Sequence, residues 1–116
     1  MKVFVYWNLH KNLWSVKALD GEHKGRVILR STFVTLENPV PKVSEVGRQR
    51  VLREQRKNVH AGITGTLVAR EAPQGNAVSY NPYKGAFFYF RNTGAPVTEE
   101  GHKRAHFTDN RGVFFK

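Results

Sequence analysis

The sequence predicts an α+β domain, with a curved antiparallel sheet of about six or seven strands and one principal basic helix at about residues 44–58. Three observations support this prediction. Apolar and polar residues alternate near the N-terminus, a basic segment follows a proline pair, and short apolar runs separated by turn residues fill the C-terminal half. The length of 116 residues fits a single domain, residues 1–116.

The N-terminal segment predicts a β-hairpin. Residues 2–9 and 13–19 both show the two-residue period of a strand, and residues 10–12 form a polar break between them. Trp7 and Trp14 are expected to face each other across this hairpin. Two further short strands are predicted at residues 26–29 and 33–36.

A break and then a helix are predicted next. Residues 37–41 are expected to interrupt regular structure, because Pro39 and Pro41 cannot donate backbone hydrogen bonds. Ser44 is a good N-cap for a helix over residues 44–58, and the basic last turn complements the helix dipole. On a helical wheel, one narrow core face collects Val51, Leu52, Gln55 and Val59.

The C-terminal half predicts strands joined by loops. Residues 60–68 are typical of a loop that runs into a strand, and residues 86–91 predict the most apolar strand of the sheet. A last hairpin is expected from residues 105–108 and 113–115, with a turn at residues 109–112.

Composition restricts the class of protein. The absence of cysteine excludes a disulfide scaffold, a zinc ribbon, an iron–sulfur cluster and a thiol nucleophile. No apolar run approaches the roughly 20 residues of a membrane helix, and no signal peptide is expected. Lys and Arg number 19 against 9 Asp and Glu, a net charge of +10. Such a basic intracellular domain is expected to have an anionic partner.

Several strings of the chain resemble known sequences. They are MKVFVYWNLHKNLWSVKAL at the N-terminus, then KGRV, VSEVGRQRVLREQRKNVHAGITGTLV and YNPYKG. Over about residues 1–85, the chain resembles a group of small accessory proteins encoded by tailed bacteriophages and related mobile elements. The resemblance implies a phage accessory protein in the host bacterial cytoplasm. It also implies a counter-defence role, for example inhibition of a CRISPR effector (an anti-CRISPR function), and it transfers no catalytic residues.

The basic segment is the strongest functional feature. Arg50, Arg53 and Arg56 are three residues apart, so a helix would present about one guanidinium group per turn to successive phosphates. We therefore predict that DNA, RNA or a host nucleoprotein complex contacts the basic residues Arg48, Arg50, Arg53, Arg56 and Lys57. Two alternatives remain for this basic segment. It is a solvated face without a binding partner, or it belongs to an adaptor that binds an acidic surface of a host protein.

A second contact is predicted at the turn that follows residue 80. Tyr83 and Lys84 combine an aromatic ring with a cation, a pairing that suits base stacking beside a phosphate. The sequence thus predicts a nucleic-acid or partner surface made from the basic segment and this turn.

Neither a cofactor nor a metal ion is expected. His102 and His106 have the i, i+4 spacing that places two ligands on one helix face, but the residues around them are basic and would repel a cation. Gly62 and Gly65 follow the predicted helix, whereas a phosphate-binding loop precedes one. The segment around His102 is expected to be an exposed basic loop.

The main enzymatic alternative is a small metal-independent ribonuclease. His60, at the end of the basic segment, is the candidate general acid or base, with Glu54, Tyr80 and Tyr83 as candidate partners. No carboxylate stands close to His60 in sequence to orient its ring. A binding protein without catalytic residues is therefore the preferred hypothesis.

Overall fold

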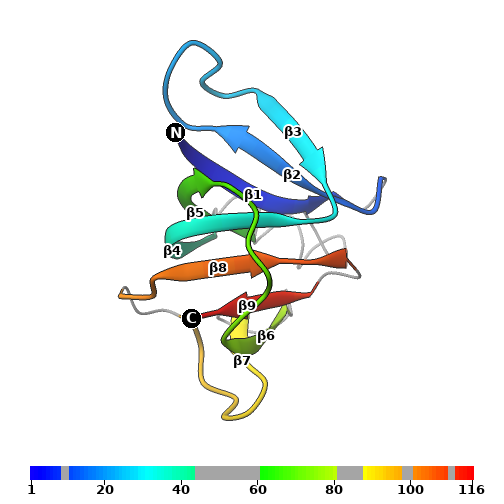
Figure 1. Cartoon of the computed structure of the whole chain (residues 1–116), viewed down its shortest axis with the longest axis vertical. Helices are drawn as coiled ribbons and strands as arrows, with labels where there is room; N and C mark the ends of the chain where they lie inside the picture. The colour runs from blue at the N-terminus through cyan, green and yellow to red at the C-terminus, as the bar shows by residue number, and fades with distance from the viewer. Residues whose placement is uncertain (9–10, 44–60, 81–87, 98–100, 110–111) are drawn as a thin grey trace.

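The computed structural model describes residues 1–8, 11–43, 61–80, 88–97, 101–109 and 112–116, which form one nine-stranded antiparallel sheet (Figure 1). Its strands are β1 (Lys2–Asn8), β2 (Leu13–Ala18), β3 (Val27–Ser31), β4 (Val34–Val43), β5 (Ala61–Val68), β6 (Asn76–Tyr80), β7 (Phe88–Phe90), β8 (Arg104–Phe107) and β9 (Val113–Phe115). Their order across the sheet is β3-β2-β1-β5-β4-β8-β9-β6-β7. Several neighbours in the sheet are therefore far apart in sequence.

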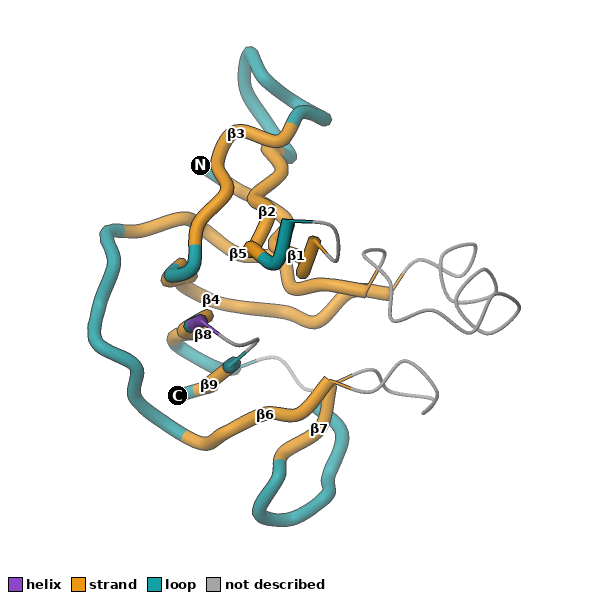
Figure 2. Tube along the Cα trace, turned by 90° about the vertical axis from the view of Figure 1, so that its right-hand side faces the viewer, coloured by secondary structure: helices purple, strands orange, loops and turns teal. Residues whose placement is uncertain are grey.

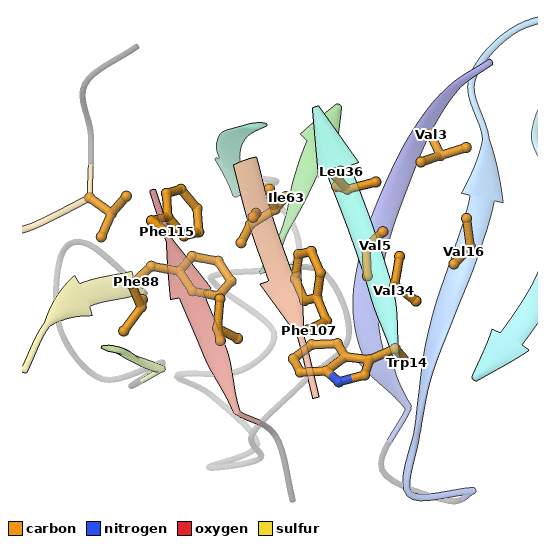
Figure 3. Packing of buried hydrophobic residues seen from close by; sticks show 14 residues of the cluster. Val3, Val5, Trp14, Val16, Val34, Leu36, Ile63, Phe88, Phe107 and Phe115 are labelled. Atoms are coloured by element: carbon orange, nitrogen blue, oxygen red, sulfur yellow. The ribbon is translucent and has the colours of Figure 1, made fainter. Parts of the chain in front are cut away.

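The sheet curls so strongly that β2 meets the end of β8. The strands β1, β5 and β4 lie between them in the hydrogen-bonding order. Nevertheless, the buried indole Nε1–H of Trp14 donates a hydrogen bond to the Thr108 carbonyl at 2.7 Å, and the Trp14 ring packs edge-on against Phe107 at 4.9 Å between centroids. Figure 3 shows these two rings side by side. As a result of the curl, the part of the sheet that contains β2 faces the part that contains β8.

The hydrophobic core fills the inside of this curl. Alternate residues of each strand point inward, so that cross-strand pairs such as Val5 with Val16 and Leu36 with Ala105 lie in register. The core cluster comprises Val3, Val5, Trp14, Val16, Val34, Leu36, Ile63, Val78, Phe88, Val97, Ala105, Phe107, Val113 and Phe115 (Figure 3). Burial of this apolar face is what favours the curled form over a flat sheet.

The prediction of an α+β fold with six or seven strands was wrong. The residues that the structure describes form nine strands in one sheet and contain no α-helix. The helix predicted at residues 44–58 falls on residues 44–60, outside the described part of the chain. Residues 61–65, predicted as part of a loop, instead begin β5, which pairs with both β1 and β4. Backbone hydrogen bonds to a strand on each side stabilise this glycine-containing segment as a strand, although glycine is unfavourable there.

The break predicted at residues 37–41 was also wrong, because β4 continues through both prolines. A β-bulge between Glu37 and Val40 shifts the register, and Asn38 there has a φ of 52°. Beyond the bulge β4 pairs with β5 alone among the described strands, since its pairing with β8 ends at Glu37. Prolines are tolerated at bulges and on edges that need no N–H donor.

Two sequence predictions about hairpins are confirmed. β1 and β2 pair in the expected register, with Trp7 opposite Trp14 and their ring centroids 5.0 Å apart. β8 and β9 also pair as the predicted C-terminal hairpin, with Phe107 opposite Val113. Both predictions depend on the alternation of apolar and polar residues within each strand. A connection of only a few residues then determines which residues of the two strands pair.

Residues 69–75, here called the strap, connect β5 to β6 across the outside of the sheet. The strap passes over β4, β8 and β9 in Figure 1 and forms the long teal arc of Figure 2. It ends at Gly75, whose φ of +100° favours glycine, and a Cβ atom there would collide with the backbone carbonyl of Phe115. The backbone of β9 thus fixes where the strap ends.

Replacing Trp14 by Phe should remove the buried hydrogen bond that holds the curl. We expect the free energy of unfolding to fall by about 1–3 kcal/mol more than in Trp7→Phe, because the donor to the Thr108 carbonyl is removed. Urea denaturation of both variants measures the difference. Equal losses would show that the hydrogen bond does not hold β2 against β8.

Gly75→Ala should be more destabilising than Gly94→Ala. Both glycines have positive φ, but a Cβ at Gly94 meets no atom within 4 Å, so that control carries only the backbone cost of about 1–2 kcal/mol. The Gly75 variant adds a clash with the backbone, which typically costs a further 1–3 kcal/mol or so. Thermal unfolding compares the two, and similar melting temperatures would contradict the close approach.

Candidate functional site

Polar side chains gather on the outer face of β4 and β8. Thr35 pairs with His106 and Glu37 pairs with Arg104, whereas Leu36 and Ala105, which lie between these pairs, point into the core. This is the alternation of a strand with one face on the core and the other available for polar groups. The sheet therefore brings an imidazole, a guanidinium, a hydroxyl and a carboxylate onto one surface.

Arg104 ties this surface to the strap. Its Nε donates to Glu71 Oε1 of the strap at 3.1 Å, and its Nη1 lies 3.3 Å from Glu37 Oε2 on β4. The backbone N–H of Glu71 also donates to Thr35 Oγ1 at 3.0 Å. All three charged side chains are between about a third and half exposed, so each ion pair contributes no more than about 1 kcal/mol. Their main effect is to fix the position of the strap.

A pocket of about 340 Å³ opens between the strap and the sheet. Its lining residues are Glu71, Ala72, Gln74, Lys103, Arg104, His106 and Lys116. The backbone N–H of Lys103 donates to the backbone oxygen of Lys116 at 2.8 Å, which holds the two lysines on adjacent segments. Lys116 Nζ donates to Gln74 Oε1 at 2.7 Å and connects the C-terminal segment to the strap.

His106 is the buried group of this pocket. Only 2% of the residue is exposed, and its Nδ1 atom has no hydrogen-bond partner in the structure. Burial lowers the pKa of His106 below its ordinary value of 6.5, and the charges of Arg104 and Lys116 lower this pKa further, whereas Glu71 opposes the shift. The ring is therefore neutral at physiological pH.

The pocket has a positive electrostatic character. Lys103, Arg104 and Lys116 supply three cationic side chains, and Glu71 supplies the one carboxylate side chain of its lining. The Lys116 ammonium group is hydrogen-bonded to the neutral side-chain amide of Gln74. An arrangement of cations around a neutral imidazole suits an anion rich in oxygen atoms.

The predicted contact residues lie outside the described part of the chain. They are Arg48, Arg50, Arg53, Arg56, Lys57, Tyr83 and Lys84, together with the alternative catalytic residue His60. Their roles stay predictions. The candidate site of the structure is a different set of residues.

The expectation of an exposed basic loop around His102 is confirmed for residues 101–103, where Gly101 and Lys103 are exposed, but it does not extend to His106. His106 is buried in β8 beside Thr35, whereas the His102 ring packs against Phe115 and Phe90 at centroid distances of 5.1 and 5.8 Å. His102 precedes the first residue of β8, so the two rings do not belong to one strand, and the helical spacing between them has no structural meaning. Within the described ranges, no three His, Asp or Glu side chains are grouped as metal ligands.

Sequence reasoning missed this pocket because its residues come from three separate segments. Only the alternation of Arg104 and His106 with Ala105 and Phe107 signals a shared polar face. Nothing in the sequence shows that Glu71 and Lys116 meet them.

Across the residues described here, no helix is long and apolar enough to cross a membrane.

The lowered pKa of His106 should make stability depend on pH. As the pH falls, the unfolded chain takes up this proton first, so the stabilisation is complete above about pH 6.5 and is lost as the pH falls through the lowered pKa. We expect the free energy of unfolding to drop by up to about 1.4 kcal/mol per pH unit from this group. Denaturation of the parent and His106→Gln at several pH values should show a shallower dependence in the variant. Parallel profiles of unfolding free energy against pH in the parent and His106→Gln would contradict the assignment of this dependence to His106. The control is His23→Gln, a change in an exposed turn.

Comparison with known proteins identifies the family. The family model described as the Mycobacterium phage L5 gene 82 protein matches residues 1–114. A curated relative, the Gene 82 protein of Mycobacterium phage L5, is 44% identical over 119 residues, covering 95% of this chain and 92% of the relative. This confirms the resemblance to phage proteins that the sequence strings indicated. No solved structure matches the chain. With nearly its whole length matched, the chain belongs to the family of the Mycobacterium phage L5 gene 82 protein.

Proposed function

We propose that this phage protein binds nucleic acid, free or within a host nucleoprotein complex, in the cytoplasm of the bacterial host. The observation that carries the proposal is the excess of 19 Lys and Arg over 9 Asp and Glu. Phosphates are the most abundant dense anions that such a protein meets in a cell, and their neutralisation releases counterions. Inhibition of a host defence complex that holds nucleic acid, such as a CRISPR effector, is one specific form of this function.

The arrangement of the carboxylates supports the proposal. Glu37 and Glu71 both pair with Arg104, so two of the nine acidic side chains are engaged by a single cation. Many other cations of the sheet and its loops are exposed: Lys2, Lys24, Arg26, Arg30, Lys42, Arg70, Arg91, Lys103 and Lys116. A large positive charge on a surface weakens the compact fold through self-repulsion, and an anionic partner removes that cost.

The basic segment is the proposed principal contact. Changing Arg50, Arg53 and Arg56 to Ala should weaken binding to a labelled oligonucleotide. It should also reduce the slope of log K against log salt by about 0.7–0.9 for each phosphate that the variant no longer neutralises. The matched control changes Lys24, Arg26 and Arg30 to Ala, which removes the same charge from the β2–β3 end of the sheet. Fluorescence anisotropy at several salt concentrations measures both variants.

Three outcomes decide between the classes of function. A larger reduction of affinity and slope in the basic-segment variant than in the control supports the proposed contact. Binding that does not respond to salt, or equal reductions in the two variants, contradicts it. Cleavage of RNA by the parent protein in EDTA, abolished in His60→Gln, would instead establish the ribonuclease alternative.

A further inference from the structure

The pocket under the strap has a feature that a general basic surface does not need. Its imidazole, His106, is almost completely buried, and the Nδ1 atom has no hydrogen-bond partner. A buried polar group without a partner is unfavourable, and native proteins contain few of them. The Nδ1 atom has almost no accessible surface, so a ligand in the pocket meets the His106 ring at the atoms that line the wall.

The charges around His106 define the sign of that ligand. Arg104 is balanced by Glu37 and Glu71, whereas Lys103 and Lys116 line the same pocket without a carboxylate within ion-pair distance in the described structure. The Lys116 ammonium group is held in place by the neutral Gln74 side chain. Lys103 and Lys116 therefore provide positive charge at the pocket. Arg104, whose charge is balanced by Glu37 and Glu71, holds the strap against the sheet.

The size of the pocket defines the ligand further. A volume of about 340 Å³ lies near the lower end of the range for small-molecule sites, about 300–1,000 Å³. It is roughly ten times the share of one water molecule in the liquid, about 30 Å³, so a phosphate group leaves space for an attached sugar. An internal phosphodiester carries a sugar on both sides, and the strap on one side of the pocket obstructs a continuous strand.

We propose that the strap pocket binds a phosphate monoester of a nucleotide, either free or at the end of a nucleic-acid strand. The His106 ring lies against the bound group, Lys103 and Lys116 contribute the opposite charge, and Gln74 keeps Lys116 oriented. Glu71 and Arg104 hold the strap over the ligand. Recognition of a strand end rests on the proposed nucleic-acid binding, whereas recognition of the free monoester does not.

The first experiment titrates the protein with AMP, adenosine and inorganic phosphate by isothermal titration calorimetry. AMP is expected to bind and adenosine is not, because the nucleoside lacks the anion. Lys103→Ala combined with Lys116→Ala should weaken AMP binding by about tenfold or more, because the charge-assisted hydrogen bonds of both lysines to the phosphate are lost. Both lysines are exposed, so this variant should fold. The matched control is Lys24→Ala combined with Lys42→Ala.

A second measurement reports on His106 itself. The ring resonances of this histidine should shift when AMP is added and stay unchanged with adenosine, as NMR of ¹⁵N-labelled protein can show. AMP binding that is absent, that weakens equally in the control variant, or that leaves the His106 ring unperturbed would overturn the proposal. These readouts do not require a His106 variant to fold.

The last experiment separates the two sources of the monoester. Oligonucleotides with a 5′-phosphate and with a 5′-hydroxyl are compared in direct binding and in competition with AMP. Stronger competition by the phosphorylated strand assigns the site to strand ends. If AMP binds and neither oligonucleotide does, the pocket is a nucleotide site and the proposed nucleic-acid function fails. If both oligonucleotides bind equally and AMP does not, the pocket proposal fails and nucleic-acid binding stands.

Discussion

The contact between Trp14 and the end of β8 is the constraint on which the rest of the structure depends. A flat sheet of nine strands would expose its apolar face, and no α-helix among the described residues covers that face. The curl solves this problem within one sheet, because β2 closes onto Phe107 and the Thr108 carbonyl. The inner face then becomes the core, and the outer face of β4 and β8 becomes free to carry polar residues.

Strand order then determines where the candidate site lies. β5 and β6 follow each other in the described sequence but are separated by β4, β8 and β9 in the sheet. Four strand spacings of about 4.8 Å require a crossing of about 19 Å. Seven extended residues reach about 25 Å at most, so residues 69–75 cross the sheet nearly extended and close to its surface. Contacts of Glu71 with Thr35 and Arg104 are a consequence of this short path.

Local patterns predicted the hairpins but neither the sheet order nor the site. Alternation around Trp7 and Trp14 was sufficient for β1 and β2, because a short turn fixes their register. The pairing of β4 with β8 joins residues about 70 positions apart, and nothing in either segment specifies the other. Pro39 and Pro41 suggested a break because the sequence alone reveals that proline lacks a backbone N–H. The bulge that accommodates these prolines in β4 depends on the pairing with β5, which the sequence does not reveal. The pocket was missed for the same reason.

The two kinds of cation in the pocket have different physical roles. The planar guanidinium of Arg104 presents several donors in fixed directions, which suits the bridging of Glu37 on β4 to Glu71 on the strap. A lysine ammonium is a compact charge on a flexible stem, so Lys103 and Lys116 can adjust to an incoming anion at little structural cost. Placing the carboxylates on the arginine keeps them from cancelling the lysines. The same ion pairs that fix the strap therefore keep these carboxylates away from the two lysines beside His106, so the position of the strap and the charge of the pocket have one common origin.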